Sequence, residues 1–172
     1  MKLTDICEDG KAATALWISE IAIQMIDEKE KNYHFCRETI DLCWEWLMNK
    51  NVGIWDIYDR ISYNEENLLD IVTDIYIKEP NLSYKYNMIL MSVTYVDWQA
   101  FNYDEDEPGY PEDLNEMNDE EFEAFINRLI ENRIVKKSAY ESLLCYLKEN
   151  YCEENKLAVK EKIIEMVQNK DI

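Results

Sequence analysis

Apolar residues recur at the spacing of an α-helix in segment after segment of this 172-residue chain. One such face, with members at i, i+3, i+4, i+7 and i+8, consists of Phe122, Phe125, Ile126, Leu129 and Ile130. No stretch shows the sustained alternation of apolar and polar residues that is typical of a half-buried strand. Three glycines and three prolines leave few tight turns, which favours long helices with short connections. The sequence therefore predicts an all-α fold, an irregular bundle of about seven helices.

The limits of these helices are predicted from their apolar faces and from end signals. A short helix or ordered loop is expected over residues 54–61. Longer helices are expected over about 12–27, 33–50, 63–78, 82–103, 118–133, from 138 onward, and 154–169. Spacing typical of a capping box at a helix start occurs in Ser62/Glu65, Asn118/Glu121 and Ser138/Glu141.

Particular side chains are assigned to the core or to a turn on the same grounds. Trp17 and Trp44 lie in apolar helical patterns and are expected in the core. Gly53 follows the second helix closely and is expected to supply a left-handed residue after the helix end. Inward-facing positions are predicted on the third helix at Leu68, Leu69, Val72, Ile75 and Tyr76, and on the last at Leu157, Ile163, Ile164 and Val167.

Length and charge limit the class of protein. The chain suits one domain, residues 1–172, and its 47% hydrophobic content excludes disorder. A net charge of −19 disfavours nucleic acid and an anionic membrane as partners, because both require a basic surface. The N-terminus lacks an apolar run of signal-peptide length, and no run could span a membrane. Five cysteines within helical patterns indicate reduced thiols, so a cytoplasmic location is expected.

Catalytic, metal and cofactor sites are not expected. The pairs Cys36/Cys43 and Cys145/Cys152 are each seven residues apart, which is too far for a local zinc motif or a disulfide within one helix. An EF-hand reading that begins at Asp104 would place prolines at two loop positions and end without its glutamate. The single histidine, His34, stands between aromatic residues at a helix start, and no nucleophile or phosphate-binding motif is present. The sequence predicts a protein that is not an enzyme and has no cofactor.

The segment 86–127 holds twelve acidic residues and no lysine, arginine or histidine. Aromatic residues and two of the three prolines are interleaved with these carboxylates. Solvated surface is the ordinary explanation for such a run. Tyrosine and tryptophan beside an acidic patch are also typical anchors of a protein–protein contact, and charge of one sign accelerates encounter with a basic partner. Taken alone, the residues leave both explanations open.

Two segments resemble a known family. The first is CWEWLMNKNVGIWDIYDRI, residues 43–61, and the second is TYVDWQAFNYDEDEPGYPEDLNEMNDEEFEAFI, residues 94–126. Together they are similar to the all-α immunity proteins, family six, of bacterial polymorphic toxin systems. The second segment departs from the family pattern in placing Tyr110 directly before Pro111, after an inserted DEDEPG.

The resemblance implies a non-catalytic protein that binds and neutralises a cognate toxin domain. Many toxins of these systems are nucleases with basic clefts, so a basic protein partner is expected. From composition, the predicted partner-binding residues are Trp98, Tyr103, Asp104, Asp106, Glu107, Tyr110, Glu112, Asp113 and Glu116. A helical scaffold or adaptor, or an inhibitor that mimics nucleic acid, remains the alternative.

Overall fold

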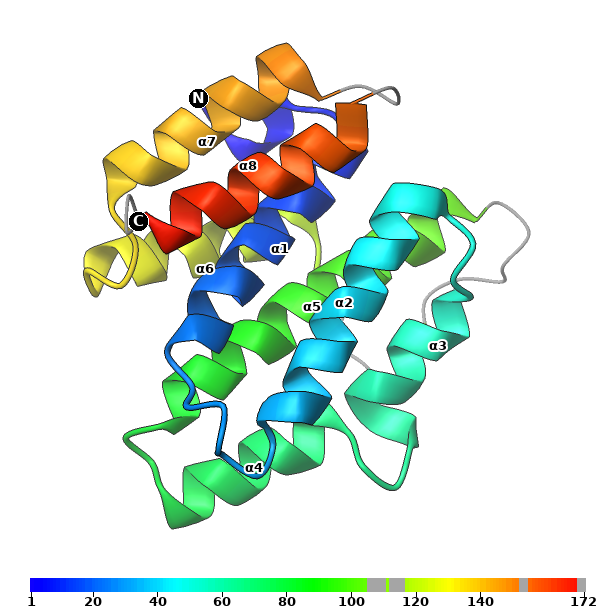
Figure 1. The fold of residues 1–172 in the computed structure, drawn as a ribbon, viewed down its shortest axis with the longest axis vertical. Coiled ribbons are helices and arrows are strands. Elements are labelled where there is room, and N and C mark those ends of the chain that lie inside the picture. Colours follow the sequence, from blue (N-terminus) through cyan, green and yellow to red (C-terminus); the bar gives the residue numbers. More distant parts are fainter. Residues whose placement is uncertain (105–110, 112–116, 152–154, 170–172) are drawn as a thin grey trace.

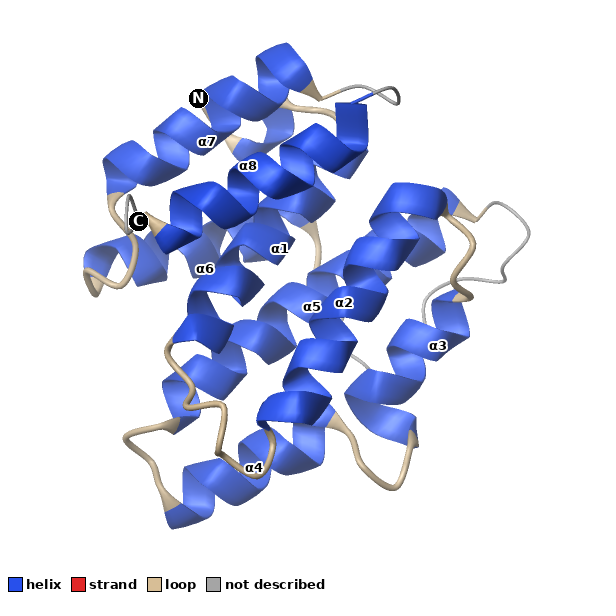
Figure 2. Cartoon of the chain, viewed as in Figure 1, coloured by secondary structure: helices blue, strands red, loops and turns tan. Residues whose placement is uncertain are grey.

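The structure, a computed structural model, describes residues 1–104, 111, 117–151 and 155–169. All regular elements in these ranges are helical, as Figure 2 shows. In chain order they are η1 (Leu3–Asp5), α1 (Glu8–Gln24), α2 (Tyr33–Asn49), α3 (Ile54–Tyr58), the π-helical turn η2 (Asp59–Tyr63), α4 (Leu68–Lys78), α5 (Ser83–Tyr103), α6 (Asp119–Glu131), α7 (Lys137–Asn150) and α8 (Lys156–Gln168). Seven of these helices have eleven or more residues, so the predicted all-α fold of about seven helices is confirmed.

Helix α1 is the centre of the fold. All its residues from Gly10 to Ile23 are buried, because its most extensive contact is with α5 while α2, α7 and α8 also pack against it (Figure 1). A helix that is apolar on every side is stable in water only when neighbours cover it completely. The buried residues of all the long helices form one hydrophobic cluster, which includes the predicted core residues Trp17 and Trp44.

A buried ion pair joins α1 to α2. Arg37 donates from both terminal nitrogens to the Glu20 carboxylate, at 2.8 and 2.9 Å. The indole Nε1 of Trp44 donates to the same carboxylate at 2.8 Å. Glu20 is a charged residue, yet it is only 7% exposed, because α2 supplies these partners.

Several predicted helix ends are wrong. A helix start at Ser62 was predicted, but the chain stays helical through Ser62 and Tyr63, since Ile57, Tyr58 and Ile61 form one buried face. Helix α4 begins later, after Asn67, whose side chain accepts a bond from the amide of Asp70 at 2.9 Å. Likewise, α7 begins at Lys137, before Ser138. The left-handed residue after α2 is Lys50, with φ of 53°, and Gly53 has an ordinary φ of −64°. The capping box at Asn118 and Glu121 is confirmed, with bonds of 3.0 and 3.2 Å.

Three predicted inward positions are also wrong. Leu69 is 37% exposed and Tyr76 is 67% exposed, because α4 packs only one edge, carrying Leu68 and Ile71, against α5 and η2. Leu157 is 60% exposed. The buried apolar residues of α8 recur every four positions, at Val159, Ile163 and Val167, and Leu157 lies off that line.

Candidate functional site

The acidic segment 86–127 is divided among α5, the connection after it, and α6. Of the predicted partner-binding residues, the structure describes Trp98, Tyr103 and Asp104. The others lie outside the described residues: Asp106, Glu107, Tyr110, Glu112, Asp113 and Glu116. The structure therefore describes the start of this site, where α5 ends and the acidic connection begins.

Tyr103 and Trp98 differ in their accessibility. Tyr103, in the last turn of α5, is 60% exposed, and its ring meets the Trp46 ring edge-on with centroids 6.3 Å apart. The Nζ of Lys50 lies 4.9 Å from the centre of the Tyr103 ring, a cation–π contact. Trp98 is half-buried and stacks on Tyr95 at 5.9 Å. Tyr103 is thus an exposed but supported ring, whereas part of Trp98 belongs to the core.

A second exposed ring, Trp55, was missed by the sequence analysis as a contact residue. Trp55 on α3 is 45% exposed and meets Phe101 edge-on at 5.2 Å, close to the C-terminal end of α5. It also meets Tyr58 at 5.4 Å. In the sequence, Trp55 lies beside the apolar face of Ile54, Ile57 and Ile61 and not within it, and this position could have indicated an exposed ring. Two exposed rings, from α3 and α5, therefore lie near the point where the acidic connection starts.

Some carboxylates of the acidic segment bind other parts of the same chain. Asp119, the first residue of α6, accepts a bond from Lys11 Nζ at 2.6 Å and another from the Tyr95 hydroxyl at 2.6 Å. Glu123 accepts a bond from the backbone amide of Leu3 at 2.7 Å. Asp97 is fully buried in α5. Asp119 and Glu123 therefore join elements of the fold, and Asp97 is buried inside it, so none of the three is offered to a partner.

The Asp119 contacts are electrostatically matched. Burial alone lowers the pKa of Lys11, but its hydrogen bonds to Asp119 and Glu8, with their charges, outweigh burial and raise that pKa above its usual value. Burial first, and then the hydrogen bond to Asp119, raise the pKa of Tyr95 well above its usual value. A charged lysine and a neutral phenol therefore both donate to the Asp119 side chain. This arrangement fixes the start of α6 against α1 and α5.

The groups considered for metal or thiol chemistry lie as follows. Among the described residues, no group of three or more His, Cys, Asp or Glu could hold a metal ion. His34 is exposed and packs edge-on against Tyr33 at 5.7 Å. Cys36 and Cys43 are buried free thiols; burial raises the pKa of Cys36 to about 12 and that of Cys43 further. Both thiols are therefore protonated at neutral pH and are poor nucleophiles.

None of the helices in the described ranges has the length and apolar character needed to cross a bilayer.

Comparison with known proteins gives one match. The family model described as "Immunity protein Imm6" matches residues 10–132, from the first turn of α1 to the end of α6. Neither curated proteins nor solved structures yielded a match. The matched range covers 123 of the 172 residues and contains both segments on which the resemblance was based. The chain therefore belongs to the Imm6 family of immunity proteins.

Proposed function

We propose that this immunity protein neutralises a cognate toxin domain by covering it with an acidic aromatic face at the C-terminal end of α5. The residues proposed for this face are Trp98, Tyr103, Asp104, Asp106, Glu107, Tyr110, Glu112, Asp113 and Glu116, together with Trp55, whose ring meets Phe101 near the end of α5. Binding alone inhibits the toxin, so the protein needs no catalytic group. The expected occupant is a basic surface such as the substrate cleft of a nuclease.

The observation that carries this proposal is the pair of exposed rings at the root of the acidic run. Tyr103 and Trp55 are 60% and 45% exposed, and each is supported from behind by another ring, Trp46 or Phe101. Exposed aromatic rings are common energetic anchors of protein interfaces. A supported ring also loses little conformational freedom on binding, which favours affinity.

Charge supports the same face. Between Asp104 and Glu116 the sequence has seven carboxylates and no basic residue. Asp119 and Glu123, farther along, already bind Lys11 and the Leu3 amide, so the charge offered to a partner is concentrated before α6. Such a field steers a basic partner toward the face and raises its association rate. In a nuclease cleft, carboxylates would take the positions of phosphates and aromatic rings those of bases.

The test uses the toxin domain encoded by the gene adjacent to that of this protein. Asp106, Glu112 and Asp113 are changed together to lysine, and binding is measured by surface plasmon resonance at low and moderate salt. We expect the association rate at low salt to fall by about tenfold or more, because steering is lost. We expect rescue of toxin-producing cells by co-expression to fail in parallel.

A matched control reverses three exposed carboxylates outside the family-matched range or at its edge, Glu131, Glu149 and Glu161. This variant has the same net charge as the first. If both variants bind the toxin equally, only the overall charge matters and the acidic aromatic face is refuted as the contact. If the wild-type protein neither binds the domain nor rescues cells, the toxin-neutralising function itself is refuted.

A further inference from the structure

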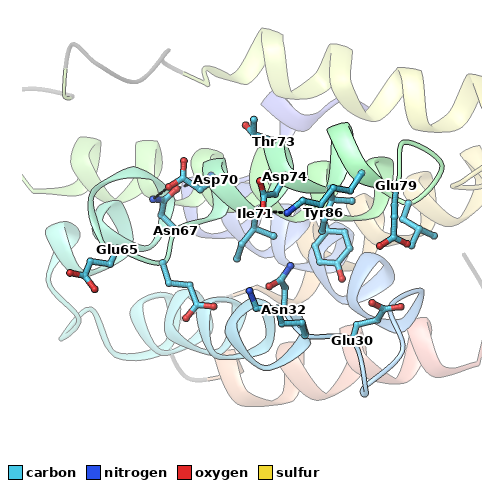
Figure 3. Close-up of a pocket in the computed structure, with 15 residues that line it drawn as sticks. Glu30, Asn32, Glu65, Asn67, Asp70, Ile71, Thr73, Asp74, Glu79 and Tyr86 are labelled. Carbon is cyan, nitrogen blue, oxygen red and sulfur yellow. Dashed lines mark hydrogen bonds and ion pairs between the residues drawn. The ribbon is translucent and has the colours of Figure 1, made fainter.

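A second feature lies at the opposite end of α5 from the acidic aromatic face. A groove of about 530 Å³ opens between the segment before α2, the helix α4 and the first turns of α5 (Figure 3). Because α5 has 21 residues, the two ends are about 30 Å apart. The groove therefore lies well away from the acidic connection.

The rim of this groove is strongly acidic. It carries six carboxylates, from Glu30, Glu65, Glu66, Asp70, Asp74 and Glu79. Among the residues that the structure describes, the basic side chains in its lining are Lys31 and Lys78, which leaves an excess of four negative charges. Lys78 bonds Asp74 at 2.7 Å, and this contact lowers the pKa of Asp74. Lys78 therefore compensates the charge of Asp74 and not that of the other rim carboxylates.

The floor of the groove carries an unpartnered polar group. Tyr86 is only 3% exposed, and its hydroxyl makes no hydrogen bond to any residue in the described ranges. Figure 3 shows this hydroxyl directed into the space toward Glu30 and Asn32, away from the ring's own helix. The Tyr86 side chain is thus buried, while its hydroxyl oxygen, which is not one of the fully buried polar atoms without a partner, is open to the groove and can accept a hydrogen bond from a ligand there.

The groove's neighbours decide which ligand suits it. No three of the described carboxylates are close enough together to hold a metal ion. A neutral ligand would leave the excess negative charge uncompensated. A guanidinium or ammonium group compensates that charge, donates to the Tyr86 hydroxyl oxygen, and lets its aliphatic stem lie along Ile71, which is 7% exposed.

We propose that this groove receives a basic side chain, arginine or lysine, from the bound toxin and forms a second contact with it. The inference rests on the proposed function, because the toxin is taken as the partner. The volume of the groove exceeds that of one side chain, so the basic residue would enter together with the short toxin segment that carries it. The proposal predicts a contact at the N-terminal end of α5 that does not depend on the acidic connection.

The test changes the floor without removing its packing. Tyr86→Phe keeps the ring and removes only a hydroxyl that bonds none of the described residues, so thermal stability is expected to stay within experimental error. We expect the Kd for the cognate toxin domain, measured by isothermal titration calorimetry, to rise about tenfold, the loss of one hydrogen bond to a charged group. A separate rim variant, Glu30→Gln with Glu79→Gln, is expected to weaken binding as well. Tyr84→Phe, on the same helix but outside the groove, is the matched control and should not change it.

The toxin side of the contact is found by changing its surface arginines and lysines to glutamine one at a time. One of these changes should be non-additive with Tyr86→Phe in a double-mutant cycle. If the groove variants bind the toxin as the wild type does while the variants of the acidic aromatic face bind weakly, the groove inference is overturned and the proposed function stands. If no basic residue couples to Tyr86, the proposed occupant is wrong. If the wild-type protein does not bind the toxin, both proposals fail together.

Discussion

The buried ion pair between α1 and α2 allows a quantitative test of how the helical body is held together. The change is Arg37→Met, which keeps an apolar stem but removes the guanidinium. Glu20 is then left as a buried carboxylate whose remaining bond comes from Trp44 Nε1 at 2.8 Å. We expect a substantial loss of stability, because an uncompensated charge must either stay buried or take up a proton.

The magnitude follows from burial. Removing one partner of a fully buried pair costs about 3–5 kcal/mol. The Glu20 side chain is 9% exposed and that of Arg37 is 25% exposed, so the low end, about 3 kcal/mol, is expected. For a chain of this size that corresponds to a fall in Tm of about 6–12 °C.

The assay is urea unfolding followed by circular dichroism. Asp41→Asn is the matched control, because Asp41 also accepts a bond from Arg37 at 2.8 Å but is 58% exposed. It should cost about 0.5 kcal/mol, as exposed pairs do. Adding Glu20→Gln to Arg37→Met removes the stranded charge and should restore part of the loss. If Arg37→Met and Asp41→Asn are equally destabilising, the pair does not act as a buried one and the reasoning is refuted.

Three further predictions concern the same framework. Trp44→Ala should cost about 3–5 kcal/mol in denaturant unfolding, and Trp44→Phe clearly less, while the folded protein keeps its toxin affinity; an affinity change at full folding would contradict this. Burial, followed by nearby charges that include those of Glu30 and Glu79, raises the pKa of Tyr86 to about 12 from 10.0, and the pKa values of Tyr95 and Tyr140 are also raised. Since the folded-state pKa of each tyrosine lies above the unfolded one, their contribution to stability is complete below pH 10. That of Tyr86 is lost as pH rises through about 12, and those of Tyr95 and Tyr140 persist to higher pH, which urea midpoints and tyrosinate absorbance should show. Arg133→Gly should raise the unfolding free energy by up to about 1 kcal/mol, because φ at this residue is 58°. Lys50→Gly should lower the unfolding free energy, because it removes the contacts to Asp9 and Trp46. If both changes shift the unfolding free energy in the same direction, this reasoning is refuted.

The helices could be predicted because burial leaves a periodic trace in the sequence. The face of Phe122, Phe125 and Ile126 was apparent without any structure, and all three residues are buried. Helix ends were less secure, because the capping-box spacing also occurs inside helices. Asn118 and Glu121 use it, but Ser62 lies within a helical turn that the buried Ile61 extends, and Ser138 lies inside α7.

The candidate site was less predictable, because its key relations join distant positions. Acidic density along the chain located the segment, but nothing near Asp119 in sequence indicates Lys11, which is 108 residues away. The groove is likewise assembled from the segments around Glu30, Asp70 and Tyr86. A single sequence carries no record of such pairings, and only the packing of α1, α4 and α5 brings them together.

The complete burial of α1 has a practical consequence for dissecting the protein. The family match ends at Asn132, but α7 and α8 lie directly against α1, and Lys156 of α8 bonds Asp9 at 3.2 Å. A fragment trimmed to the matched range would expose one flank of its most apolar helix to water, and we expect such a fragment to aggregate. A minimal fragment that still folds must therefore keep α7 and α8, because they bury one side of α1, even if they make no contact with a toxin.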